Sequence, residues 1–284
     1  MKIIDSLVHA QGQISARDIV DAGLEAEVLV RHVLGMQRSD LFAALEEPMA
    51  PAHGAGICRL VERRLRGEPL AYIVGHKEFY ALSFLVNPSV LIPRQETELL
   101  VEKVLDICAA RPPRPTIADV GTGCGAIAIA IACNRPDAIV YATDISRQAL
   151  AIADLNRHRH AVEHRVLLWQ ADLLESLREP VDVLVSNLPY LKTGEIAGLP
   201  EDVKREPHRA LDGGIDGLDL IGRLMQQAER YVRPEGCILV EIDPAQLESV
   251  SQMARDAIPG ARVSFALDLL GLPRVVVVER HPDP

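Results

Sequence analysis

The sequence predicts an α/β protein in which a doubly wound, mainly parallel sheet follows a small helical domain. Two observations lead to this prediction. From residue 116 onward, continuous apolar segments alternate with helical ones, and the strands of a parallel sheet read as unbroken apolar runs because both faces are covered. Before residue 70 the apolar residues instead recur with the period of a helix. We therefore expect two domains of different architecture.

The chain is expected to divide into a helical domain at residues 1–71, a β-hairpin or linker at 72–94 and the α/β domain at 95–284. In the first part, segment 23–35 has helical periodicity and stops at Gly35, while Pro48 and Pro51 interrupt the pattern. Residues 72–94 change period and combine aromatic and β-branched residues with turn formers, which indicates a hairpin connector.

The alternation of apolar and helical segments predicts the range of each strand and helix in the α/β domain. A helix at about 96–109 comes first, and a stiff proline-rich loop follows it. Strands are predicted at 116–120, 138–144, 165–172, 181–187, 237–242 and 274–280. Helices are predicted at about 126–133, from residue 146, at about 218–232 and after residue 242.

Composition bounds the function. A hydrophobic content of 48% supports a packed core, and a net charge of -10 argues against a protein that lives on nucleic acid. The five cysteines are scattered, and neither they nor the nine histidines show metal-ligand spacing, so we expect no disulfide framework and no metal. The N-terminus has only short apolar pairs, and no apolar run approaches about 18 residues. A cytoplasmic protein is expected.

A glycine-rich turn, Asp119-Val120-Gly121-Thr122-Gly123-Cys124-Gly125, lies between the first predicted strand of the sheet and a helix. Glycines allow a tight turn and a close approach to a ligand, with N–H groups of the helix start pointing at it. Asp144 ends the next strand, where a carboxylate is placed to accept both ribose hydroxyls of a nucleoside. The pair predicts a nucleoside site, and the glycine spacing differs from the GxGxxG of nicotinamide cofactors.

Asp172 and Leu173 close the third predicted strand. A carboxylate there can accept a hydrogen bond from the amino group of an adenine, and Leu173 supplies an apolar face. With Asp119 and Asp144, three strand ends then carry carboxylates around one glycine turn, at the edge where open sheets bind ligands. S-adenosylmethionine fits this arrangement better than a dinucleotide does.

Asn187-Leu188-Pro189-Tyr190 follows the fourth predicted strand. An amide or aromatic amino group is a poor nucleophile because its lone pair is delocalised, and positioning is what methyl transfer chiefly needs. The Asn187 side chain and the Leu188 carbonyl would each accept one N–H of such a group. Pro189 would fix the chain direction, and Tyr190 would cover the flat face. A simple turn with a packed tyrosine is the alternative.

These residues give the chain a resemblance to class I S-adenosylmethionine-dependent methyltransferases, and more specifically to the PrmC/HemK family of release factor glutamine N5-methyltransferases. The resemblance covers nearly the whole chain. Its segments are GEPLAYIVGHKEF, VLIPRQETE, DVGTGCGAIAIAIA, ATDIS, SNLPY, REPHRALDGGIDGLD and VEIDPAQ. The second and sixth are the most specific, since neither follows from binding the cofactor.

The resemblance implies a role for each residue. Gly121, Thr122, Gly123, Cys124 and Gly125 would embrace the methionine part of S-adenosylmethionine, which leaves as S-adenosylhomocysteine. Asp144 would bind the ribose, Asp172 and Leu173 would border the adenine, and Asn187 to Tyr190 would hold the glutamine amide. The implied substrate is the glutamine of the GGQ loop in peptide chain release factors, which the helical domain helps to dock. A related group modifies a ribosomal protein.

Two positions depart from the family pattern. Leu188 stands where the family usually has a second proline, and Asp243 stands where EIG is common. Asn-Leu-Pro-Tyr also occurs in rRNA adenine dimethyltransferases, so an adenine substrate is an alternative, although the acidic net charge counts against it. A non-catalytic cofactor-binding module is a further alternative, which the complete tetrad disfavours. A monomer is expected.

Overall fold

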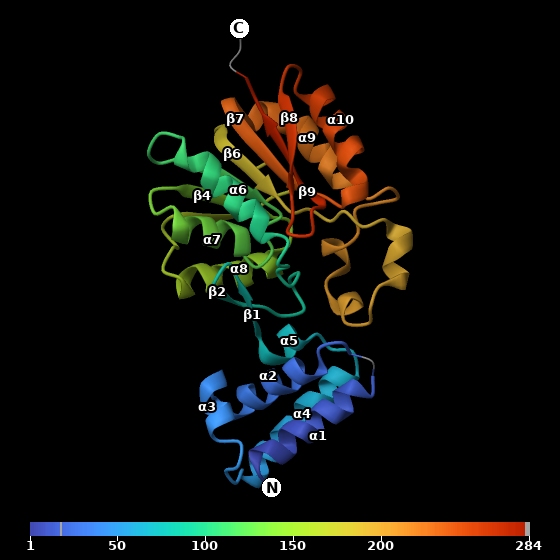
Figure 1. Ribbon diagram of the computed structural model, residues 1–284. Helices are drawn as coiled ribbons and strands as arrows, with labels where there is room; N and C mark the ends of the chain where they lie inside the picture. The colour runs from blue at the N-terminus through green and yellow to red at the C-terminus, as the bar shows by residue number, and fades with distance from the viewer. Residues whose placement is uncertain (18, 282–284) are drawn as a thin grey trace. The chain divides into compact units, whose positions relative to one another are not determined.

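The computed structural model describes residues 1–17 and 19–281 (Figure 1). Its contacts divide the chain into two compact units, Met1–Gly75 with Pro200–Arg205, and His76–Leu199 with Glu206–Pro284. This division differs from the expected one in two ways. The hairpin groups with the α/β unit, and residues 200–205 group with the helical unit although they lie far along the chain.

The helical unit consists of α1 (Ile3–Ser15), α2 (Ala22–Leu34), α3 (Arg38–Ala43), α4 (Pro51–Leu65) and α5 (Leu70–Val74). Gly35 ends α2 with a φ of 65, the left-handed conformation that closes many helices. Pro51 was expected to interrupt a helix, but it begins α4 instead. Proline is well suited to a first helical position, where its missing N–H costs no hydrogen bond.

A buried arginine accounts for the grouping of residues 200–205 with the helical unit. The guanidinium of Arg64 lies 2.7 Å and 3.0 Å from the two carboxylate oxygens of Glu25, and Nη2 also donates to Asp202 Oδ2 at 3.3 Å. The side chain of Arg64 is only 8% exposed. Since a buried guanidinium must be paired, this cluster ties the later segment to α2 and α4.

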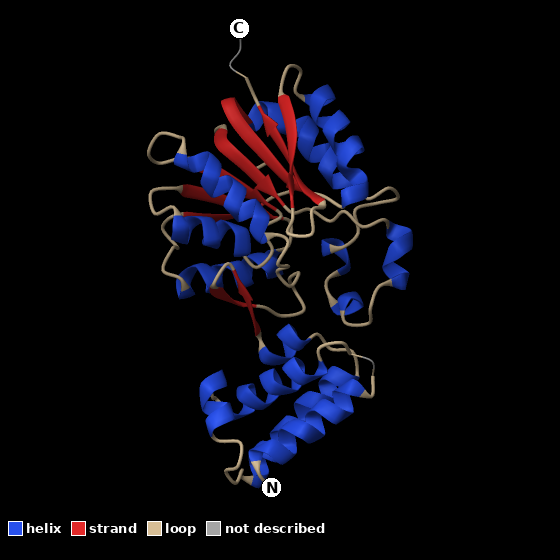
Figure 2. Ribbon diagram, viewed as in Figure 1, coloured by secondary structure: helices blue, strands red, loops and turns tan. Residues whose placement is uncertain are grey.

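The α/β unit is built on a seven-stranded sheet in the order β5-β4-β3-β6-β7-β9-β8 (Figure 2). The strands are β3 (Thr116–Val120), β4 (Ile139–Asp144), β5 (Val166–Gln170), β6 (Val181–Ser186), β7 (Val232–Glu241), β8 (Arg262–Leu267) and β9 (Pro273–Glu279). All neighbours are parallel except that β9 runs antiparallel to β7 and β8. The predicted fold class, a mainly parallel doubly wound sheet, is confirmed.

Helices cover both faces of this sheet. The helices α6 (Glu98–Ala109), α7 (Ala126–Asn134) and α8 (Arg147–Arg159) pack on one face, and α9 (Asp219–Tyr231) and α10 (Leu247–Ala257) pack on the other (Figure 1). The 3₁₀ turns η1 (Thr193–Gly198), η2 (Val203–Arg205), η3 (His208–Ala210) and η4 (Pro244–Gln246) lie in the connections. None of the helices in the described ranges has the length and apolarity needed to cross a membrane.

A buried asparagine joins the hairpin to the α/β unit. The hairpin strands are β1 (His76–Phe79) and β2 (Leu82–Leu85). Asn156 of α8 is 0% exposed; its Oδ1 accepts from the N–H of Leu85 at 2.7 Å and its Nδ2 donates to the Leu85 carbonyl at 3.0 Å. Nδ2 also donates to the carbonyl of Cys124 at 2.9 Å. One side chain thus ties β2, α8 and the glycine turn together.

Replacing Asn156 by alanine is expected to lower the free energy of unfolding by about 3–9 kcal/mol, because each of the three backbone groups that lose their partner costs about 1–3 kcal/mol. Urea unfolding followed by the fluorescence of Trp169, the chain's single tryptophan, measures this in the α/β unit. Gln148→Ala, at an exposed position of the same helix, is the matched control. Equal stability of the two variants would contradict the role given to Asn156.

Candidate active site

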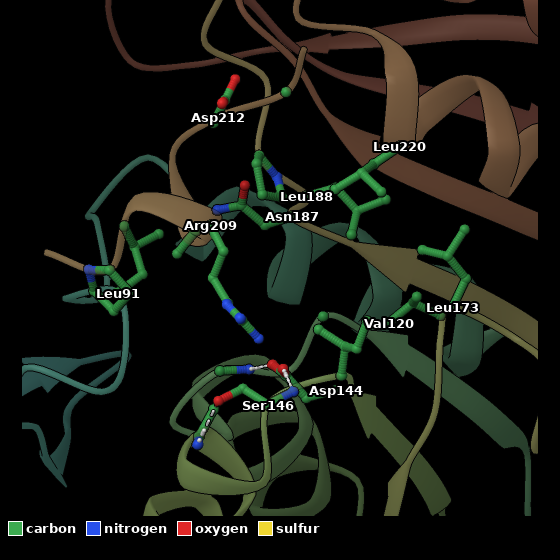
Figure 3. Close-up of a pocket in the computed structure, with 18 of the residues that line it drawn as sticks. Leu91, Val120, Asp144, Ser146, Leu173, Asn187, Leu188, Arg209, Asp212 and Leu220 are labelled. Atoms are coloured by element: carbon green, nitrogen blue, oxygen red, sulfur yellow. Dashed lines mark hydrogen bonds between the residues drawn. The ribbon is translucent and has the colours of Figure 1, made fainter. Parts of the chain in front are cut away.

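The carboxyl ends of β3, β4, β5 and β6 meet at a cavity of about 670 Å³ (Figure 3). The chain proceeds from β3 to β4 and β5 on one side and then returns to place β6 on the other side of β3. This reversal is the switch point at which open parallel sheets bind ligands. The cavity lies within the α/β unit, as all its lining residues belong to that unit.

Asp144, at the end of β4, lines this cavity. Its Oδ2 accepts from the N–H of Gly123 at 2.9 Å and its Oδ1 accepts from the N–H of Ser146 at 2.8 Å. Burial raises the pKa of the carboxyl, while these two N–H groups and the charge of Arg209 oppose the rise. Figure 3 shows the Arg209 side chain extending across the cavity toward Asp144. The carboxylate is therefore fixed in place, with lone pairs left for a ligand.

Asp172 and Leu173 also line the cavity. Oδ2 of Asp172 accepts from Nη2 of Arg223 at 2.7 Å, so its charge is paired within the protein. Leu173 has a φ of 54, unusual for a residue with a side chain, and its carbonyl accepts from the Thr143 hydroxyl at 3.0 Å. The hydrogen bond from Thr143 helps to hold this strained backbone, and Leu173 forms an apolar wall after the end of β5.

The glycine turn approaches the cavity through its backbone. Gly121 and Gly123 line it, whereas Thr122, Cys124 and Gly125 do not. The N–H groups of Gly121 and Thr122 both donate to the Thr143 carbonyl at 2.9 Å, and that of Gly123 donates to Asp144. These three N–H groups are therefore paired within the protein, and the expectation for the N–H groups of the helix start, from Ala126 onward, stays a prediction. The turn contributes mainly closeness of approach.

Asp119 and Cys124 lie behind the turn. Asp119 is 0% exposed, and its Oδ2 accepts from the Thr122 hydroxyl at 2.6 Å and from the N–H of Ala128 at 3.2 Å. Burial raises its pKa to about 7. Burial also raises the pKa of the Cys124 thiol to about 12, so that group stays neutral. In this structure both residues shape the turn from inside, although we expected them beside the cofactor.

The tetrad that follows β6 divides between the cavity and the core. Asn187, Leu188 and Pro189 line the cavity, and Nδ2 of Asn187 donates to the hydroxyl of Thr97 at 3.0 Å. Leu188 is 4% exposed and belongs to the main apolar core. Tyr190 is not among the lining residues; its hydroxyl donates to Glu241 Oε1 at 3.4 Å. Burial raises its pKa, so the phenol is neutral.

The loop that contains GGIDGLD packs directly on the tetrad backbone. A Cβ on Gly213 would lie 2.6 Å from the Pro189 carbonyl oxygen, and one on Gly217 would lie 2.2 Å from that of Tyr190. Gln246, from the VEIDPAQ segment, donates through Nε2 to the carbonyls of Tyr190 at 2.9 Å and Gly217 at 3.2 Å. Only glycine allows this approach, which immobilises the tetrad.

The VLIPR segment is held by a buried carboxylate. Glu206 is 4% exposed, and its Oε2 accepts from the N–H of Ile92 at 2.9 Å while Oε1 pairs with the guanidinium of Arg94. Val90 and Leu91, just before this clamp, line the cavity. The two segments that the resemblance marks as most specific are therefore joined at the rim of one site.

Several residues of this site were not predicted individually. They are Thr97, Glu206, Gly213, Gly217, Glu241 and Gln246. Each lies in a segment that the resemblance marked, so its motif was the signal, but nothing local revealed its partner. Asp243 shows a smaller effect: with a φ of -67 it adopts an ordinary extended conformation and caps η4. Aspartate in place of glycine there introduces no strain.

The fold and the site together define a class I methyltransferase domain: a doubly wound sheet with an acidic strand end, a glycine turn and an Asn-x-Pro-Tyr segment around one cavity. The model of the methyltransferase small domain matches residues 95–202. A solved methyltransferase from Pyrococcus furiosus shares the fold, with a TM-score of 0.52 and 15% identity over 78% of this chain and 97% of that one.

Matches over the remaining part and over the whole chain identify the family. The model of the PrmC N-terminal domain matches residues 5–75. A release factor glutamine methyltransferase of Moorella thermoacetica is 44% identical, with 90% of each chain covered. One of Koribacter versatilis is 40% identical over 98% of each chain. This chain belongs to the family of release factor glutamine methyltransferases.

We predict that Gly217→Ala destabilises the α/β unit by more than about 1–3 kcal/mol. The residue has a φ of 78, which an L side chain rarely adopts, and the new Cβ would collide with the Tyr190 carbonyl. Thermal unfolding followed by Trp169 fluorescence measures the loss. Gly198→Ala is the control, because a Cβ there meets nothing within 4 Å. A Gly217→Ala melting temperature equal to that of the control would refute the close contact.

Proposed function

We propose that this protein transfers the methyl group of S-adenosylmethionine to the side-chain amide nitrogen, N5, of a glutamine in the GGQ motif of a peptide chain release factor. The carrying observation is that Asn187 lines the same cavity as Asp144 and Asp172. An amide acceptor thereby stands beside two carboxylates suited to an adenosine. Membership of the family supports the choice of a glutamine.

The residues present suit S-adenosylmethionine. A cavity of about 670 Å³ is of the size that holds a cofactor. Asp144 retains lone pairs for ribose hydroxyls, and Leu173 offers an apolar wall to an adenine. Gly121 and Gly123 leave room for a chain of methionine size beside β3. We assign Asp144 to the ribose, Asp172 and Leu173 to the adenine side, and the glycine turn to the methionine part.

The protein's contribution to the reaction is positioning. When bound, S-adenosylmethionine supplies a methyl group on a sulfonium and leaves as S-adenosylhomocysteine. Asn187 Oδ1 and the Leu188 carbonyl would each accept one N–H of the substrate amide, which turns the nitrogen lone pair toward the methyl carbon. Nitrogen gains the methyl group and then loses a proton, so no side chain has to act as a general base. Pro189 keeps the two acceptors in register.

Tyr190 and Leu188 refine this proposal. Tyr190 was expected to cover the substrate, and we now give it a supporting role, since its hydroxyl interacts with Glu241. Leu188 packs in the core, where a Cβ on Gly121 would lie 3.0 Å from its Cδ2. The leucine therefore fills interior space and gives no reason to prefer an adenine. We propose a monomeric enzyme acting in the cytoplasm.

The deciding experiment uses S-adenosylmethionine with a labelled methyl group. The protein and this cofactor are incubated in separate reactions with a release factor, with ribosomal proteins or with rRNA. We expect label in the release factor, at the glutamine of its GGQ motif by mass spectrometry of peptides. A GGQ-to-GGE release factor is the matched control and should remain unlabelled. Label that enters RNA or a ribosomal protein, and not the release factor, would overturn the proposal.

We expect Asp144→Asn to weaken the binding of S-adenosylhomocysteine by about tenfold or more, because hydrogen bonds to a charged group contribute about 1.5–3 kcal/mol. Calorimetry measures the affinity. The 2′,3′-dideoxy form of the same ligand is the control: it should bind the variant and the unchanged protein about equally. If the dideoxy ligand is equally sensitive to the substitution, Asp144 does not bind the ribose hydroxyls.

A further inference from the structure

A chain of buried polar groups lies behind Asn187. Thr97 is 5% exposed and Glu241 is 1% exposed. The Thr97 hydroxyl accepts from Asn187 Nδ2 at 3.0 Å, and it lies near enough to the Glu241 carboxylate to lower the pKa of that group. Tyr190 approaches the same carboxylate at 3.4 Å. Of these groups only Asn187 lines the cavity. The proposed reaction assigns no role to Thr97 or Glu241.

The start of α6 does not need the hydroxyl of Thr97. Thr97 has helical backbone angles and its side chain makes no capping bond. The N–H groups of Glu98 and Leu99 already donate to the carbonyls of Gln95 and Glu96. The hydroxyl is therefore available to Asn187, whose Nδ2 it meets at 3.0 Å.

Proton counting sets the direction of this chain. A hydroxyl has one proton, and an ionised carboxylate can only accept. The Thr97 hydrogen bond lowers the pKa of Glu241, as expected when the hydroxyl donates to the charged form. The proton of Thr97 is then directed to Glu241, and its lone pairs face Asn187. This agrees with the structure, in which Nδ2 of Asn187 donates to the Thr97 hydroxyl at 3.0 Å, and it leaves Oδ1 of Asn187 for the substrate.

We propose that Thr97 is a positioning residue that, oriented by Glu241, commits the Asn187 amide to face the substrate as a hydrogen-bond acceptor. The proposal deepens the proposed function and rests on it. An acceptor at this point selects substrates that offer an N–H, such as a primary amide, and disfavours the oxygen of a carboxylate. Thr97 thus determines specificity without touching the substrate.

The charges around Glu241 allow this arrangement near neutral pH. Burial raises the pKa of Glu241 to about 7, and the charge of Glu96 adds to the rise. Thr97, Arg274 of β9 and the Tyr190 hydroxyl oppose it. Above about pH 7 the carboxylate accepts from Thr97. Below it, a protonated Glu241 can donate to Thr97, whose own proton is then free to turn to Asn187 and draw its oxygen away from the cavity.

The test compares Thr97→Val with Thr97→Ser in the full-length enzyme. Valine keeps the size of the side chain but cannot hold the amide, whereas serine keeps the hydroxyl. We expect kcat for methylation of the release factor to fall by about 10–100-fold in Thr97→Val and to stay within about threefold in Thr97→Ser. The affinity for S-adenosylhomocysteine should be unchanged in both. Equal kcat in the two variants would overturn the proposal.

Glu241→Gln gives a second, nearly isosteric test that holds even if Thr97→Val does not fold. Glutamine can donate as well as accept, so it no longer dictates the proton of Thr97. We expect the unchanged enzyme to lose activity as pH falls through about 7, and we expect Glu241→Gln to have a lower kcat without that pH-dependent loss. A Glu241→Gln enzyme with the original kcat and pH profile would refute the relay.

The failure of this proposal can be told from failure of the proposed function. If the unchanged enzyme labels no glutamine in the release factor, the proposed function fails and so does the inference. If the unchanged enzyme labels the glutamine but serine and valine at residue 97 behave alike, the function stands and only the role of Thr97 is lost.

Discussion

The site depends on the fixed conformation of the four residues that follow β6, Asn187 to Tyr190. Three segments that a plain nucleoside-binding sheet lacks contact these four residues. Gly213 and Gly217 bring a loop against their backbone, Gln246 binds the carbonyl of Tyr190, and Thr97 binds the side chain of Asn187. An amide nitrogen reacts only when its lone pair points at the methyl carbon. The contacts that fix these four residues therefore serve to orient the substrate amide.

The carboxylates of the site fall into two groups, one that lines the cavity and one that is buried behind it. Asp144 and Asp172 lie at strand ends and face the cavity. Asp119 and Glu241 are fully buried, each with a pKa raised to about 7. Each of the two has one carboxylate oxygen without a hydrogen-bond partner among the described residues. Such groups are costly, so their presence behind the glycine turn and behind Asn187 indicates that orientation there outweighs stability.

Much of the fold could be predicted because parallel strands that are covered on both faces are continuous apolar runs in the sequence. β3 and β6 are continuous apolar runs, and their predicted ranges agree closely with the structure. β8 could not be recognised, since this edge strand has no fully buried residue and forms no continuous apolar run. The site was predictable as a set of strand ends, but not the direction of each side chain. Whether Asp119 faces a ligand or the core depends on its partner Ala128 and on packing that spacing does not encode.

The hydrogen-bond pairs of the site could not be predicted, because the two partners lie far apart in the sequence. Thr97 and Asn187 are 90 residues apart, and Tyr190 and Gln246 are 56 apart. A local pattern can mark each as belonging to an unusual segment, yet only the fold brings them together. Leu188 illustrates the same limit from the other side. In the sequence it is the position that raised an adenine substrate, whereas in the structure its side chain lies in the core against Gly121. In the proposed function the substrate meets the backbone carbonyl at that residue, which any residue supplies. The proposal therefore assigns the discrimination between substrates to Asn187 and to the groups that orient it.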